Sequence, residues 1–149
     1  MRSRISTAYF IVLLLLYGAL GALYYFKAEW TPPDLTLAPD QSKASPRTVF
    51  TVTASDRDSD LRSLRVLVHQ GSDTVTIIKK DLPAGTREYS EQFSLPKTGI
   101  KNAPLILEVT VRDTSWHRFG WGNKAEVVRG MEIDSRPPMI SVLSGQHNV

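Results

Sequence analysis

The chain has 149 residues, 42% of them hydrophobic, with 18 basic and 15 acidic side chains and no cysteine. This length accommodates one ordinary domain and a short appendage, and the lack of cysteine excludes a fold held by disulfides. Arg2 and Arg4 precede the first apolar run, so the rest of the chain carries 16 basic against 15 acidic residues. That near-neutral balance gives no electrostatic case for a nucleic-acid partner.

The first predicted element is a membrane-spanning helix over residues 8–26, a run of 19 residues without charge. As a helix it extends about 28 Å, close to the thickness of the hydrocarbon core of a bilayer. Arg2 and Arg4 lie before it, whereas Lys27 and Glu29 cancel after it. The positive-inside rule therefore places residues 1–7 in the cytoplasm and the chain after the span outside.

These features predict a single-pass protein of a bacterial inner membrane, with the lipid bilayer as a partner and a periplasmic C-terminal domain. Tyr24, Tyr25 and Trp30 fit an aromatic belt at the outer interface. A cleavable signal peptide is the alternative, with Ala19 and Gly21 as the small residues before a cleavage site. Because the apolar run continues to residue 26, its length favours an uncleaved signal-anchor.

After a linker over residues 27–33, the pattern changes to short runs that alternate apolar and polar side chains. Leu35 and Leu37 indicate one strand, and six further runs follow at residues 49–54, 64–69, 74–79, 87–96, 104–113 and 126–134. No run after residue 26 has the 3.6-residue period of a helix. Seven short strands over about a hundred residues are typical of an immunoglobulin-like antiparallel β-sandwich, an all-β domain that we place over residues 34–134.

The segment 31–41, TPPDLTLAPDQ, is partly repeated at 136–146 as RPPMISVLSGQ, an offset of 105 residues. Both copies begin with a proline pair, continue with alternating apolar residues and end in glutamine. A repeat with this period predicts that residues 135–149 form a linker and the first strand of a second, truncated β-module. We therefore expect this chain to be the front part of a longer protein.

Acidic residues at alternate positions, Asp56, Asp58 and Asp60, resemble the start of a calcium-binding loop. Counting from Asp56, an EF-hand loop requires glycine at its sixth place and an acidic residue at its twelfth. Leu61 and Leu67 stand there instead. The segment is therefore more simply interpreted as a polar turn capped by aspartate side chains.

The sequence has no His-x-His, and the histidines at positions 69, 117 and 147 are each predicted to be surface or loop residues. The sequence contains no cysteine nucleophile, no Gly-x-Ser-x-Gly and no phosphate-binding glycine loop. We therefore predict no catalytic, cofactor-binding or metal-binding residue in this chain.

The most unusual loop lies between the last two predicted strands and contains the candidate binding residues Trp116, His117, Arg118, Phe119 and Trp121. Gly120 and Gly122 supply its turn, and Asn123 is able to take the left-handed conformation. Exposed aromatic rings beside a cation would stack on sugars, pack on a partner or rest on lipid. Alternatively both tryptophans fold back over the end of the domain, which the usual burial of tryptophan favours.

The segments VRDTSWHRFGWGN and IDSRPPMISVLSGQHNV, behind one membrane span, resemble the N-terminal region of membrane-anchored lysostaphin-type (LytM-domain) zinc peptidoglycan endopeptidases of Gram-negative bacteria. The residues that carry the resemblance are Asp113, Ser115, Gly122, Asn123, Ile133, Asp134, Pro137, Pro138, Ile140, Val142, Leu143, Ser144 and His147. The zinc site of that family combines a His-x-x-x-Asp with a downstream His-x-His; His69 and Asp73 have the first spacing, but no His-x-His occurs here. The resemblance thus implies that zinc and the peptidase domain belong to a downstream part of the protein.

We therefore expect a membrane anchor and periplasmic spacer of a larger cell-wall protein, by resemblance a peptidoglycan-hydrolysing metalloendopeptidase. The alternative is a stand-alone envelope binding or adhesion module, in which the 116–121 loop holds peptidoglycan or an envelope protein. A periplasmic sensor segment is a third possibility, because a β-sandwich does not discriminate among these functions.

Overall fold

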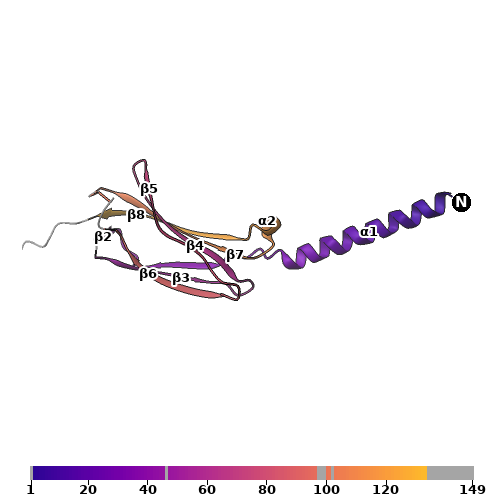
Figure 1. The fold of residues 1–149 in the computed structure, drawn as a ribbon, viewed down its shortest axis with the longest axis horizontal. Helices are drawn as coiled ribbons and strands as arrows, with labels where there is room; N and C mark the ends of the chain where they lie inside the picture. The colour runs from indigo at the N-terminus through magenta and orange to yellow at the C-terminus, as the bar shows by residue number, and fades with distance from the viewer. Residues whose placement is uncertain (1, 46, 97–99, 102, 134–149) are drawn as a thin grey trace, which may run out of the picture.

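The computed structural model describes residues 2–45, 47–96, 100–101 and 103–133 (Figure 1). Within them, one long N-terminal helix is followed by a β-rich domain and a single short helical turn. The expected second module at 135–149, and residue 134 at the predicted end of the first domain, lie outside the described residues.

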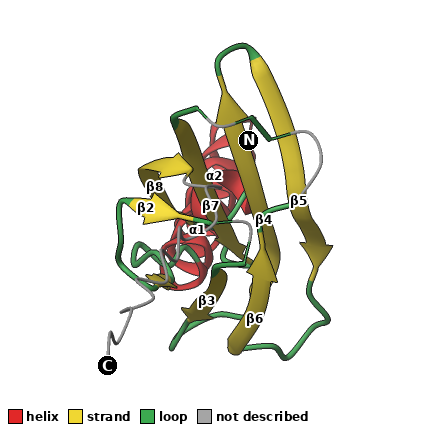
Figure 2. Ribbon diagram, turned by 90° about the vertical axis from the view of Figure 1, so that its left-hand side faces the viewer, coloured by secondary structure: helices red, strands yellow, loops and turns green. Residues whose placement is uncertain are grey.

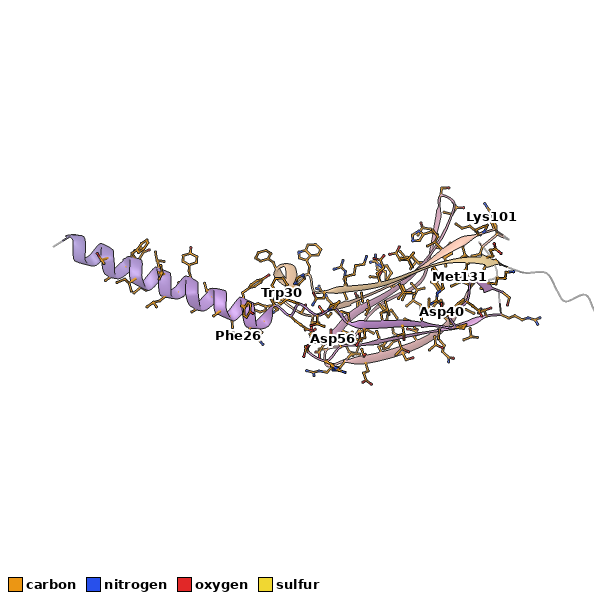
Figure 3. The ribbon with its side chains drawn as sticks, turned by 180° about the vertical axis from the view of Figure 1, so that it is seen from behind. Phe26, Trp30, Asp40, Asp56, Lys101 and Met131 are labelled. Carbon is orange, nitrogen blue, oxygen red and sulfur yellow. The ribbon has the colours of Figure 1, made fainter. Side chains whose placement is uncertain are left out.

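Helix α1 (Arg2–Lys27) contains the predicted span. Its segment Thr7–Lys27 is long and apolar enough to cross a membrane, and none of that segment is buried inside the protein. The absence of charge and of helix-breaking proline over residues 8–26 explains the uninterrupted helix. The side chains of α1 have no apolar protein surface around them along most of its length, as Figure 3 shows.

The strands follow the predicted order, with one addition. They are β1 (Asp34–Ala38), β2 (Lys43–Ala44), β3 (Val49–Ser55), β4 (Leu61–Gln70), β5 (Asp73–Asp81), β6 (Glu88–Ser94), β7 (Leu105–Asp113) and β8 (Lys124–Ile133). All seven predicted strands are present within a few residues of their expected bounds. No pattern in the sequence indicated β2, which has only two residues and therefore no alternation to detect.

Two sheets make up the domain, with strand orders β1-β3-β6 and β2-β8-β7-β4-β5. The strand pairs are antiparallel except β2 and β8, which run parallel. Figure 2, which looks along the molecule from the end remote from α1, shows β3 and β6 on one side and β4, β5, β7 and β8 on the other.

Two apolar clusters receive side chains from both sheets. In β7, Leu105, Leu107, Val109 and Val111 are buried as predicted. The first three belong to the larger cluster, where the rings of Phe50 and Phe93 stack at 5.5 Å, and Val111 belongs to the smaller one with Ala54. Such alternation buries one face of each strand and exposes the other, which fixes the register.

Arg129 on β8 joins the edges of the two sheets. Its Nη1 donates to the carbonyl of Pro39 at 2.7 Å and its Nη2 to the carbonyl of Leu37 at 3.1 Å, and it pairs with Asp40 at 3.1 Å. Leu37 lies in β1 and Pro39 follows that strand, so one guanidinium connects β8 to the smaller sheet. This cross-connection restrains the sheets against sliding.

The chain enters the domain at one end and reaches Ile133 at the other. Strand β7 runs toward α1, the 113–123 loop turns there, and β8 runs back for ten residues, which is about 33 Å. Figure 3 accordingly places Phe26 and Trp30 at one end of the domain and Met131 at the other.

The loop beside α1 contains α2 (His117–Gly120), a single helical turn. The sequence predicted no helix after residue 26, and this prediction was wrong for these four residues. A helix this short has no measurable period, so hydrophobic patterning could not have revealed it.

Candidate functional site: the helix–domain junction

The 113–123 loop is organised around the carboxylate of Asp113, which is fully buried. Its Oδ1 accepts hydrogen bonds from the backbone N–H groups of Ser115 (3.0 Å) and Asn123 (2.7 Å), and from the Ser115 hydroxyl (2.7 Å). Its Oδ2 accepts one from the amide of Asn123 at 3.0 Å. One side chain thus ties together the two ends of the loop, and hydrogen bonds of this charge-assisted kind are the stronger ones.

Gly122 allows the loop to close over Asp113. Its φ is +75°, and a Cβ at this position would lie 2.3 Å from the carbonyl oxygen of Asp113 and 2.7 Å from its Oδ1. Any side chain would therefore collide with the backbone that it must approach. Asp113, Ser115, Gly122 and Asn123, four of the residues that carry the sequence resemblance, thus act as one structural unit.

The same loop fixes the end of α1. The amide Nδ2 of Asn123 donates to the backbone carbonyls of Glu29 (3.0 Å) and Thr31 (3.1 Å), and the backbone N–H of Trp116 donates to the carbonyl of Lys27 (3.4 Å). Ala28 between these carbonyls is buried. We call residues 24–31 together with the 113–123 loop the helix–domain junction. Side-chain and backbone contacts on both sides make it a stiff connection rather than a free linker.

Aromatic side chains surround the junction. Phe119 stacks on Tyr24 with ring centroids 5.6 Å apart, and Trp30 meets His117 edge to face at 5.0 Å. Despite these contacts, Phe119 is 91% exposed, Trp121 70%, Trp30 66% and Trp116 49%. The tryptophans therefore do not fold back over the core, contrary to the interpretation that average burial favoured. Arg118 lies within α2.

Phe119 has a φ of +60°, in the left-handed region that a residue with a Cβ seldom adopts. The sequence pointed to Asn123 for such a conformation, but the positive φ angles in this loop belong to Phe119, Gly120 and Gly122. The backbone therefore holds an aromatic ring outward at a conformational cost of about 1–2 kcal/mol.

A basic hollow lies beside Trp121 on the outer face of the larger sheet. With a volume of about 410 Å³, it is lined by the basic Arg62, Arg65, Arg112 and Lys124, and by the acidic Asp81 and Glu108. Two of these cations also hold the loop in place. Arg62 donates to the carbonyl of Gly120 at 3.2 Å, and Arg112 to that of Trp121 at 3.4 Å.

An acidic group lies within the junction. Carboxylate oxygens of Glu29, Asp56 and Asp113 all lie within 4.8 Å of one another, an arrangement of the kind that can hold a hard cation such as Ca²⁺. Burial raises the pKa of Glu29, and the charges of Asp56, Asp113 and Asp58 raise it further, against a lowering hydrogen bond from Ser59. One Glu29 oxygen, Oε1, is buried without a hydrogen-bond partner among the described residues.

Asp56 caps the turn before β4, as the sequence predicted, whereas Asp60 bonds the loop between β5 and β6. Asp56 Oδ1 accepts hydrogen bonds from the backbone N–H groups of Asp58 (3.0 Å) and Ser59 (3.1 Å), and Asp60 Oδ2 from that of Gly85 (2.8 Å). These oxygens are thus occupied in shaping loops.

The two described histidines, His69 and His117, lie on different elements. His69 lies on the outer face of β4, where its Nε2 is 2.9 Å from Glu108 Oε2 and its Nδ1 is 3.0 Å from the Thr74 hydroxyl. The hydrogen bond from His69 is the largest cause that lowers the pKa of Glu108. His117 belongs to the junction, and His147 lies outside the described residues.

Sequence reasoning found the aromatic residues of this site but missed the residues that attach it to α1. Glu29 was read only as a charge after the span, and Asn123 only as a turn residue. Their contact spans 94 positions, so neither could be found from local pattern. The grouping of Asp113, Ser115, Gly122 and Asn123 in the resembling segment was the one available signal.

Asp113, Ser115 and Asn123 thus form a structural joint with an exposed aromatic rim. Comparison with known proteins adds little to this picture. No protein-family model matches the chain, and no curated protein matches it. A crystal structure of an engineered protein is similar over 68% of this chain, with 17% sequence identity and a TM-score of 0.39, and the match spans 20% of that protein.

Proposed function

We propose that this chain is a membrane anchor and periplasmic spacer that holds another part of a larger envelope protein away from a bacterial inner membrane. The observation that carries the proposal is that the chain enters and leaves the domain at opposite ends. Helix α1 joins one end through a stiff junction, and β8 runs to the other end. A flexible linker would transmit neither distance nor direction, whereas this arrangement fixes both.

The proposal includes an immunoglobulin-like β-sandwich as the spacer. Its support is the strand order, since β1-β3-β6 opposite β8-β7-β4 parallels the A-B-E and G-F-C arrangement of that fold, with β5 beside β4 in the place of an additional C′ strand. The core shared by both sheets agrees with it.

The proposed cargo is a zinc-dependent peptidoglycan endopeptidase, on the resemblance of the 111–123 and 133–149 segments to LytM-type proteins. Under this proposal the zinc and its ligands lie in a later domain, and residues 1–7 face the cytoplasm. The junction residues Asp113, Ser115, Gly122 and Asn123 then orient the anchor and take no part in the chemistry.

The test is the size and topology of the native protein. An antibody raised against residues 45–130 should detect a membrane-bound species far larger than 16.6 kDa. Protease added to the outside of spheroplasts should degrade the epitope of this antibody. Extracts of that species should cleave peptidoglycan until a zinc chelator is added. A native species of 16.6 kDa, or an epitope protected from protease, would contradict the spacer proposal.

A second candidate is a stand-alone binding module, favoured by the exposure of Trp121 beside Arg112 and of Phe119 in the same loop. Aromatic and cationic groups in this arrangement suit sugar rings or a partner protein. It predicts that the full chain in detergent retains peptidoglycan fragments and that Trp121→Ala abolishes retention without unfolding the domain.

A further inference from the structure

We propose that the exposed aromatic residues of the junction, Phe26, Trp30, Trp116, Phe119 and Trp121, form a collar that rests on the outer surface of the lipid bilayer. This collar would set the tilt of the β-domain relative to the membrane. The inference rests on the proposed membrane anchor and adds to it a second, independent contact between the protein and lipid.

The depth of the collar follows from its contacts with α1. The apolar run ends at Phe26, and Tyr24 lies two residues, about 3 Å, before that end. Phe119 stacks on Tyr24 at 5.6 Å, so its ring lies at the level where hydrocarbon gives way to headgroups. An aromatic ring that is 91% exposed in water at this height would be buried once the helix is inserted, which suits the interfacial preference of aromatic side chains.

The tryptophans line three different hollows. Trp116 lines a hollow with Phe26 and Asp60, Trp30 lines another with His117, and Trp121 lines the basic hollow, which shares Arg112 and Lys124 with that of Trp30. A binding site for one small ligand would direct its aromatic rings toward a common point. Exposed aromatics distributed over several hollows near the end of an apolar helix instead match a planar surface such as the bilayer interface.

The backbone of Phe119 supports the same conclusion. Its left-handed conformation is unfavourable, and burial within the protein offers no compensation because the side chain is nearly fully exposed. Strained conformations persist where surrounding structure enforces them, often at functional positions. Insertion of the ring into the interfacial region would supply the burial that the protein does not.

Charge determines the direction of tilt. The hollow beside Trp121 has four basic and two acidic side chains, whereas the hollow beside Trp116 contains Glu29, Asp58 and Asp60 against Lys27 and Arg87. Lipid phosphates attract the first side and repel the second. The domain should therefore lean so that Trp121 lies deeper than Trp116, more strongly so in anionic membranes.

The experiment uses the full chain in vesicles whose lipids carry bromine, a short-range quencher of tryptophan, in the upper part of the acyl chains. One variant combines Trp30→Phe and Trp116→Phe to leave Trp121 alone, and a second combines Trp30→Phe and Trp121→Phe to leave Trp116. The distal control replaces all three tryptophans by phenylalanine and adds Ile106→Trp. Ile106 is 46% exposed and lies seven residues along β7 from Asp113, about 23 Å farther from the collar.

Brominated lipid should remove most of the emission of Trp121, less of that of Trp116, and none of that of the Ile106→Trp control. Adding phosphatidylglycerol to phosphatidylcholine vesicles should widen the difference between Trp121 and Trp116, and Lys124→Glu should narrow it. Phe119→Gly should reduce quenching of Trp121 without lowering the melting temperature of the domain, because glycine tolerates the positive φ.

Alkaline carbonate extraction of the same vesicles reports insertion of α1 separately. If the chain resists extraction but Trp121 is quenched no more than the Ile106→Trp control, the collar is refuted and the anchor stands. The loop would then face water, where peptidoglycan or a protein could reach it. If carbonate removes the chain, both the anchor and the collar are refuted.

Discussion

Replacing Asn123 by alanine should loosen the connection between α1 and the β-domain. The substitution removes the amide that donates to the carbonyls of Glu29 and Thr31, at 3.0 and 3.1 Å, and to Asp113 Oδ2 at 3.0 Å, from a residue that is only 6% exposed. Its hydrogen bonds contribute about 1 kcal/mol each, and acceptors left without partners bring the total loss to about 2–4 kcal/mol. For a domain of this size, the melting temperature should fall by about 10–20 °C.

Thermal unfolding of the full chain in lipid nanodiscs, followed by circular dichroism, measures this loss. The matched control is Lys124→Ala at the next position, which removes only an exposed ion pair with Glu126 and should change the free energy of unfolding by less than about 1 kcal/mol. Because the chain has no cysteine, spin labels attached through Phe26→Cys and Ile106→Cys would report the helix–domain distance without interference.

In the parent chain that distance distribution should be narrow, and Asn123→Ala should broaden it. Equal melting temperatures for Asn123→Ala and Lys124→Ala, together with an unchanged distance distribution, would refute the reasoning. The junction would then be an ordinary linker, and the proposed spacer could not transmit an orientation.

Three further predictions concern single positions. Gly122→Ala should destabilise the domain by more than the roughly 1–2 kcal/mol of its positive φ, since its Cβ would lie 2.3 Å from the Asp113 carbonyl oxygen; equal melting temperatures would contradict this steric account. The raised pKa of Glu29 means that its contribution to stability is complete below about pH 4.3 and is lost as the pH rises through the folded-state pKa. Glu29→Gln should therefore raise the melting temperature at pH 7 but not at pH 4. This increase should be the same with calcium as with a chelator. A melting temperature that calcium raises in the parent chain but not in the variant would instead indicate cation binding. The hydrogen bond from His69 lowers the pKa of Glu108, so His69→Ala should raise that pKa, which a carbon-detected NMR titration of the Glu108 carboxylate measures. An unchanged titration midpoint would show that the hydrogen bond is absent in solution.

The strands of this fold were predictable because each has one face in a shared core. In β7, alternate positions from Leu105 to Val111 are buried. The two-residue period of apolar side chains in the sequence therefore corresponds to the buried face of the strand. Strand β2 was not predictable, because two residues beside β8 carry no period. Sequence alone could also not place α2, whose conformation depends on contacts of the loop with the end of α1.

The aromatic loop shows where composition-based reasoning fails. Tryptophan is buried on average because most tryptophans lie in proteins surrounded by water on every side, and this expectation misplaced Trp121. If α1 spans a membrane as proposed, the environment at its end includes lipid, and exposure of an aromatic ring to solvent is an incomplete description. The convergence of Glu29 with Asp56 and Asp113 was likewise hidden, because residues far apart in sequence meet only after the sheets form.

The hydrogen bonds between Asn123 and the end of α1 also impose an order on the biogenesis of the protein. Asn123 is 94 residues later in the chain than Glu29, which at ordinary rates of synthesis means a delay of about 5–20 s. Throughout that interval α1 is already synthesised while its fastening residue does not yet exist. In a nascent chain α1 is therefore loosely tethered, and the hydrogen-bonded connection between α1 and the domain is acquired only after translation has passed the last hairpin.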